Sequence, residues 1–212
     1  SGSGELDNGF TFSGYSLLKD TMTLSSSALT MTMGSMGSLT MGTAYGGNST
    51  KYDVQTPTAY EEADHNVATL GDGLDVAGDT TVVAYNTTVS GLGISVEWNP
   101  STGNAGATQA GGVAGGTNSN TGSNINYAMK YSLGGVDLAL GQSQTNYSVA
   151  GTPDDSELTY SVNWAMGPVK MGIQKSDIDS GVSTTSDYKV TAIGIAFNVN
   201  DSLSVSYNTN DA

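Results

Sequence analysis

The chain has 212 residues, enough for one large domain, and combines 29 glycines with only 37% hydrophobic residues, which does not suit a thick aliphatic core. The absence of cysteine excludes disulfides, thiolate metal sites and thiol catalysis. The formal net charge is −14, from 20 acidic residues against six lysines and no arginine. Nucleic acid is therefore excluded as a partner, because no basic patch is present to neutralise phosphates.

Side chains in the strand-like segments alternate between apolar and polar types. Ile94, Val96 and Trp98 alternate with Ser95 and Glu97, and the same alternation runs through residues 125–133 and 158–166. Successive side chains of a strand point to opposite faces, so each segment has one apolar and one polar face. Runs of about ten such residues are typical of tilted strands that cross a bilayer.

Taken in chain order, the alternation predicts about eleven strands, at residues 10–18, 28–34, 38–43, 80–89, 93–99, 124–133, 136–144, 157–166, 169–175, 187–198 and 203–209. Tight turns rich in Gly, Asn or Asp are predicted at 7–9, 35–38, 90–93, 134–135, 167–168 and 200–202. Longer polar connections are predicted at 19–27, 43–79, 99–123, 145–156 and 176–187. Because Met22 and Leu24 have the opposite parity to Leu29 and Met31, a break or bulge is predicted near 25–27.

The connections indicate the fold class. Short turns alternate with long loops, so all the tight turns share one end, as in outer-membrane barrels with short periplasmic turns and longer extracellular loops. We therefore predict an all-β, antiparallel transmembrane β-barrel, with residues 1–212 as a single domain. An antiparallel sheet cannot close on an odd number of strands, so we expect the barrel to be incomplete at both ends of this chain.

The positions of the charges test this prediction. A lysine or arginine that faces lipid at the midplane costs about 2–4 kcal/mol. Glu97, Lys130, Asp137 and Lys170 have the inward parity and are predicted to line a pore wall. Lys175 and Lys189 have the outward parity, but both flank the 176–187 loop, where a long side chain reaches the headgroups.

Three segments carry a family resemblance. Residues 5–12 (ELDNGFTF) form a turn followed by an aromatic strand, residues 37–42 (GSLTMG) form a short strand before the longest loop, and residues 196–207 (AFNVNDSLSVSY) read as strand, N-D-x-L, strand. In this order of short and long connections they resemble the general-diffusion porins of Gram-negative outer membranes. The resemblance implies a barrel of porin type with sixteen strands, of which the chain covers roughly the third to the thirteenth. It also implies an outer-membrane location, contact with lipid and a homotrimer.

The resemblance further implies a constriction. The family's long third loop folds into the lumen, and the matching segment here is 43–79, while 99–123 is a long Gly/Asn/Thr-rich extracellular loop. The acidic side chains of 43–79 would line the constriction: Glu61, Glu62, Asp64, Asp72, Asp75 and Asp79. Lys130 and Lys170 would face them, but the arginine cluster common in the family is missing. The implied function is passive diffusion of small hydrophilic solutes and ions, with cations favoured.

Several alternatives stay open at this point. The acidic segment also fits a solvated loop on a secreted, acidic β-rich structural or adhesive surface protein, and Phe10, Phe12, Trp98 and Trp164 could then pack in a soluble core. Asp72 and Asp75, in LGDGLD, are a weak calcium candidate against a plain turn, and no other cofactor is indicated. His65 is the only histidine and no G-x-S-x-G motif is present, so the sequence predicts no enzyme.

Overall fold

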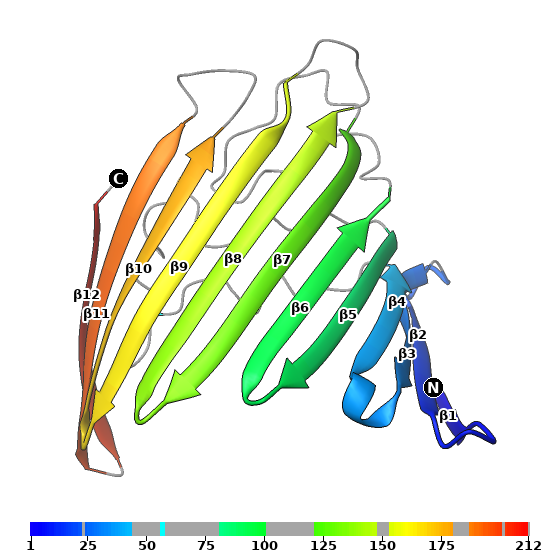
Figure 1. Cartoon of the computed structure of the whole chain (residues 1–212), viewed down its shortest axis with the longest axis horizontal. Coiled ribbons are helices and arrows are strands. Elements are labelled where there is room, and N and C mark those ends of the chain that lie inside the picture. The colour runs from blue at the N-terminus through cyan, green and yellow to red at the C-terminus, as the bar shows by residue number, and fades with distance from the viewer. Residues whose placement is uncertain are drawn as a thin grey trace.

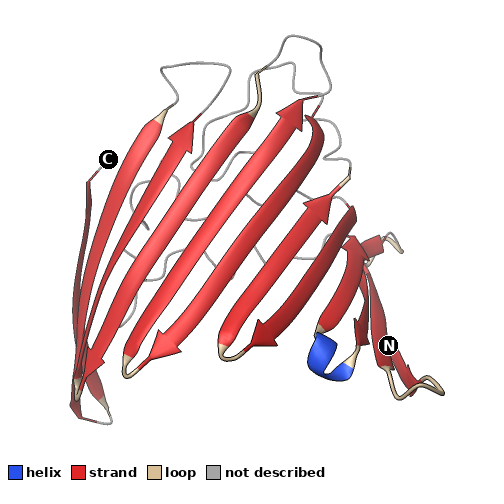
Figure 2. Cartoon of the chain, viewed as in Figure 1, coloured by secondary structure: helices blue, strands red, loops and turns tan. Residues whose placement is uncertain are grey.

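The computed structural model describes residues 1–22, 24–43, 56–57, 81–100, 121–147, 153–179, 187–200 and 202–211. Most of these residues lie in β-strands, and the one helical element among them is a 3-10 turn, η1 (Gly34–Met36) (Figure 2). The strands are β1 (Gly2–Glu5), β2 (Thr11–Leu18), β3 (Leu24–Thr32), β4 (Ser38–Thr43), β5 (Thr81–Val89), β6 (Leu92–Asn99), β7 (Thr121–Leu133), β8 (Val136–Tyr147), β9 (Asp155–Met166), β10 (Val169–Asp179), β11 (Tyr188–Asn200) and β12 (Leu203–Asp211).

The strands form a single antiparallel sheet in which every strand pairs with its neighbours in the sequence, from β1 to β12. The central strands all lean in the same direction, and the strands at both sides of the view turn edge-on, so the sheet is strongly curved (Figure 1). Within the described residues no pairing joins β1 to β12. The predicted antiparallel, all-β architecture is confirmed, as an open curved sheet.

The tight turns all lie at one end of the sheet, at the bottom of Figure 1, as the sequence predicts. Ser90 and Gly91 connect β5 to β6 with φ of 50° and 85°, and Gly134 and Gly135 connect β7 to β8 with φ of 58° and 87°. Two successive residues with positive φ give a two-residue turn the same twist as its flanking strands. The strand ends that the longer connections join lie at the opposite end of the sheet.

Exposure on the two faces of the sheet is the reverse of that in a soluble protein: the apolar face is exposed and the polar face is buried. The face that carries Ile94, Val96 and Trp98, here called the apolar face, holds most of the exposed large hydrophobic side chains, and Trp98 is 48% exposed. The face that carries Ser95, Glu97 and Asn99, here called the polar face, is covered: Glu97 is 2% exposed and Asn99 is 0% exposed. The alternative of a soluble core between two layers is therefore wrong for these side chains.

The predicted break near 25–27 is a bulge. Leu17 pairs with Ser26 while the next residue, Leu18, pairs with Leu24, which leaves Ser25 as an extra residue in β3. One extra residue in a strand moves the side chains before it to the opposite faces of the sheet. As a result β3 begins at Leu24 rather than at residue 28, and the connection from β2 is shorter than the predicted 19–27.

The strand prediction differs from the structure in two further ways. Strand β1 was not predicted, because its four residues, GSGE, contain no apolar side chain to alternate, so twelve strands are described rather than eleven. Several strands also extend further than predicted at the end opposite the tight turns: β10 continues to Asp179, not 175, and β8 to Tyr147, not 144. There the apolar face itself becomes polar, and the apolar/polar alternation fades.

Candidate functional site: the polar face of the sheet

The largest fully buried side chains of the described residues are polar and lie on the polar face of β6 to β8. They are Glu97, Asn99, Asn124, Asn126 and Ser143. Pairing explains their grouping, because Asn99 lies opposite Asn124, and Asn126 lies opposite both Glu97 and Ser143. The sheet thus brings carboxylate, amide and hydroxyl groups from three strands into one continuous polar surface.

Hydrogen bonds between neighbouring strands hold this surface together. Asn124 Nδ2 donates to Ser143 Oγ at 3.0 Å and to Thr145 Oγ1 at 2.9 Å. Buried polar groups are costly unless they are hydrogen-bonded, and these bonds satisfy the Asn124 amide nitrogen and fix its orientation. The polar face is therefore an ordered array of donors and acceptors.

The array continues on β9 and β10. The hydroxyls of Thr159 and Ser176 are 3.1 Å apart, and Gln174 Nε2 donates to Thr159 Oγ1 at 3.3 Å. All three side chains are buried on the polar face: Thr159 lies directly opposite Ser176, and Gln174 lies two residues before Ser176 on β10. Across β6 to β10 this face is rich in uncharged amides and hydroxyls.

Acidic groups interrupt the neutral surface in one row. Glu97, Asn126, Ser143 and Glu157 lie directly opposite one another on β6, β7, β8 and β9. Three strand spacings of about 4.8 Å place the backbones at the two glutamates about 14 Å apart. Asp155, 4% exposed, lies two residues from Glu157 on the same face.

Asp155 and Glu157 were missed as site residues by the sequence analysis. Asp155 was assigned to the 145–156 loop, whereas the structure begins β9 at this residue. Glu157 has the same parity as Thr159 and Ser161, and opposite parity to Leu158 and Tyr160, so the alternation contained the signal. Extending the alternation two residues into the polar connection would have found both carboxylates.

The four predicted wall residues lie on the polar face but form no cluster. Glu97 is buried towards the end opposite the tight turns, whereas Lys130 lies opposite Gly93 and Ala139, nearer the turns. Asp137 is exposed and accepts a hydrogen bond from Ser132 Oγ at 2.5 Å. Lys170 is exposed close to the β9–β10 turn. Their role in a pore wall stays a prediction.

The predicted constriction lies outside the described residues. This applies to Glu61, Glu62, Asp64, Asp72, Asp75 and Asp79, to the calcium candidate among them and to His65. Within the residues that the structure describes, no group of three or more His, Asp or Glu side chains is arranged to hold a metal ion. The described part of the segment 43–79, beyond its first residue, is Thr56–Pro57.

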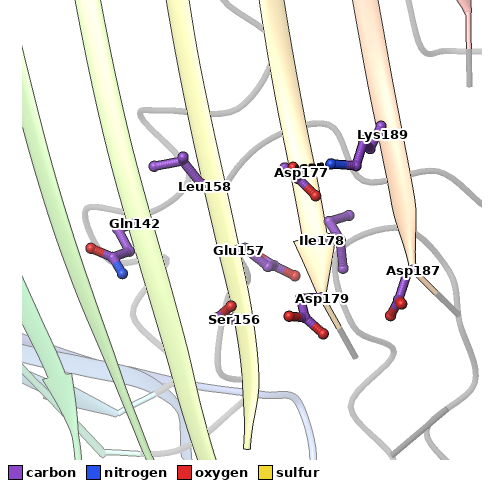
Figure 3. A pocket seen from close by; sticks show the side chains of 9 residues that line it. All are labelled: Gln142, Ser156, Glu157, Leu158, Asp177, Ile178, Asp179, Asp187 and Lys189. Atoms are coloured by element: carbon purple, nitrogen blue, oxygen red, sulfur yellow. Dashed lines mark hydrogen bonds and ion pairs between the residues drawn. The ribbon is translucent and has the colours of Figure 1, made fainter. Parts of the chain in front are cut away.

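A charged depression lies at the end of β9 to β11 opposite the tight turns (Figure 3). Lys189 Nζ contacts Asp177 Oδ2 at 2.9 Å across the β10–β11 pair, and Asp179 and Asp187 lie nearby. Lys189 and Asp177 belong to the apolar face by parity, and their side chains are 83% and 48% exposed. Two opposite charges therefore neutralise each other at this end of the apolar face.

Strand tilt explains how Lys175 and Lys189 can lie on the apolar face without standing in the middle of its apolar band. Paired residues form rows perpendicular to the strands, and because the strands lean, each row climbs away from the tight turns on going from β6 to β11 (Figure 1). The row that contains Met129, Leu140 and Tyr160 continues through Lys175 and Thr191. Lys175 and, two residue pairs further, Lys189 consequently lie close to the end of the sheet, away from the middle of the apolar band.

A curved, tilted antiparallel meander with an exposed apolar band and a covered polar face defines the wall of a transmembrane β-barrel around a polar interior. The sequence profile of the Gram-negative porins matches residues 1–212, and the chain belongs to this family. It is accordingly a channel protein of the bacterial outer membrane. Within the described residues, no helix has the length and apolar character needed to span a membrane.

Solved structures show the same fold. A refined porin structure is 15% identical to the chain, with a TM-score of 0.50 over 99% of this chain and 85% of that one. The anion-selective porin from Comamonas acidovorans is also 15% identical, with a TM-score of 0.62 over 98% of this chain and 65% of that one. The chain thus spans just under two thirds of the Comamonas protein. No curated protein matches its sequence.

Proposed function

We propose that the chain forms part of a water-filled pore through which small hydrophilic solutes and ions diffuse passively, with cations favoured. Passage requires no catalytic step and no cofactor. The exposed apolar face contacts outer-membrane lipid, and the complete protein assembles as a homotrimer, as the family resemblance implies. The exposure of this face together with the family match favours a pore over a secreted structural or adhesive protein.

The charge of the polar face carries the proposed cation preference. On the described strands its carboxylates outnumber its ammonium groups: Glu5, Glu97, Asp137, Asp155 and Glu157 stand against Lys130 and Lys170. A pore lined with an excess of one charge concentrates counter-ions, and low-dielectric walls strengthen the field. The predicted constriction acids of the segment 43–79 would add to the same sign of charge.

The test is the reversal potential of the full-length protein in planar bilayers under a KCl gradient. We expect a potential that indicates cation preference, reduced in Glu157→Gln. Asp179→Asn is the matched control, because it removes one negative charge close to Glu157 but from the apolar face. Anion preference in the unmodified protein, or an equal effect of the two substitutions, would contradict the charge argument.

A further inference from the structure

Thr56–Pro57 lies against a distant part of the sheet. These residues come from the chain between β4 and β5, yet their nearest described neighbours include Gly172 on β10 and Gly194 on β11. Both glycines lie on the polar face and pair directly with each other. Thr56 is 4% exposed. The chain therefore reaches from one side of the curved sheet to a buried position on the other.

The two glycines leave room that no other residue would leave. A Cβ on Gly194 would lie 2.6 Å from the Pro57 carbonyl oxygen and 3.0 Å from Thr56 Cβ, and a Cβ on Gly172 would lie 2.5 Å from Pro57 Cδ. Neither glycine is among those with positive φ, so backbone conformation does not require glycine at either position. Glycine inside a strand lowers strand stability, and close approach of another backbone is a reason to find it there.

Two asparagines border the glycine pair. Asn163 on β9 lies opposite Gly172, and Asn208 on β12 lies opposite Gly194, so the four residues form one row across four strands. Their side chains lean over the glycines: each Oδ1 lies within 3 Å of where a glycine Cβ would stand. The row forms a shallow seat, with the two glycines as its floor and the amides as its sides.

The segment that occupies the seat suits it. A residue before proline is restricted to extended conformations, and proline has a fixed φ and no N–H that would need a partner in the seat. Thr56–Pro57 is therefore a stiff, extended dipeptide that can lie against bare strand backbone at little entropic cost.

We propose that the Gly172–Gly194 pair is a docking seat that holds Thr56–Pro57 against the pore wall, which makes both glycines positioning residues for the width of the channel. This inference rests on the proposed pore function. By holding Thr56–Pro57 on the polar face of β10 and β11, the seat fixes one point of the chain between β4 and β5 against the pore wall.

The first test uses Thr56→Cys in the full-length protein in lipid vesicles, with a water-soluble maleimide as the probe. The 212 residues contain no natural cysteine, so within them labelling reports this position alone. We expect slow labelling in the single variant and faster labelling when Gly194→Ala is added. Gly93→Ala is the matched control, because Gly93 also lies on the polar face but its Cβ would meet only the Lys130 carbonyl oxygen, at 3.6 Å.

The second test is an oxidative cross-link between Thr56→Cys and Gly194→Cys. The two Cβ positions are 3.0 Å apart, below the separation of about 3.5–4.5 Å that a disulfide requires, so the small displacement that a Cβ at position 194 causes still leaves the two cysteines within bonding distance. Thr56→Cys with Gly93→Cys serves as the control pair and should not cross-link. Heat-modifiable migration on gels verifies that each variant has folded.

The outcomes distinguish failure of the proposed docking seat from failure of the proposed pore function. Fast labelling of Thr56→Cys alone, no effect of Gly194→Ala, or equal cross-linking of the two pairs would overturn the seat, even if the protein conducts ions. A changed conductance in Gly194→Ala but not in Gly93→Ala would support its role in channel width. A folded, unmodified protein that conducts no ions would overturn the proposed function, whatever the cross-links show.

Discussion

Replacing Val162 by lysine tests directly whether lipid covers the apolar face of the sheet. Val162 lies on the apolar face of β9, is 43% exposed, and sits in a row with Leu138, Ile173 and Ile193. If lipid covers this row, Val162→Lys places a charge near the bilayer midplane. Met166→Lys is the matched control, because Met166 lies on the same face of the same strand, next to the tight turn.

The depth difference follows from strand geometry. Four residues at about 3.3 Å each separate the two positions by about 13 Å along the strand, or about 10 Å along the membrane normal at a tilt of roughly 40°. The apolar band of such barrels is about 25 Å tall, so Val162 lies near its middle when Met166 lies near its edge. We expect Val162→Lys to cost about 2–4 kcal/mol of unfolding free energy and Met166→Lys about 0–1 kcal/mol.

The assay is denaturant unfolding in lipid vesicles, followed by tryptophan fluorescence. Trp164 lies between the two positions on the same face and reports the lipid environment locally. A loss of 2–4 kcal/mol lowers the folding equilibrium constant about 30- to 700-fold. Similar small losses for both variants would refute the reasoning, because a face exposed to water accepts lysine equally well at either depth.

Three further predictions use the same unfolding measurement. Lys189→Met should leave the free energy of unfolding almost unchanged, because its ion pair with Asp177 is exposed, and a loss as large as that of Val162→Lys would contradict this. Asn124→Ala should cost about 1–3 kcal/mol, because it leaves two buried hydroxyls without their amide donor; no measurable loss would mean that these bonds do not stabilise the polar face. Gly34→Ala should lower the free energy of unfolding by about 1–2 kcal/mol, because alanine is strained at positive φ. Gly37→Ala should lower it further, because the new Cβ at 37 would also collide with the Asn86 carbonyl. Equal losses in the two variants would count against that collision.

The strands themselves could be predicted from sequence wherever one face is apolar and the other polar. This is why β6, β7 and β9 were placed to within a few residues, and why the parity change around Ser25 indicated a bulge before any coordinates. The prediction failed where the apolar side chains run out. Strand β1 has none, and the far ends of β8 and β10 carry polar residues on both faces.

The candidate site was only partly predictable. Parity places a side chain on a face but not at a height or beside a partner, so Glu97 was assigned to the polar face while its row with Glu157 was not foreseen. The same limit applies to Lys175 and Lys189. The sequence places both beside the predicted 176–187 loop, whereas the structure puts them inside strands, because β10 continues to Asp179 and β11 begins at Tyr188.

Local features follow from the amino-acid sequence alone: where chain reversals occur, which residues share a face, and the excess of acidic groups, because each depends on neighbouring residues or on composition. Which distant residues meet depends on the tertiary structure. The register across four strands aligns Glu97 with Glu157, and the curvature of the sheet brings Thr56–Pro57 to Gly172 and Gly194. Such meetings depend on the sum of many inter-strand pairings, and no single segment of sequence contains that sum.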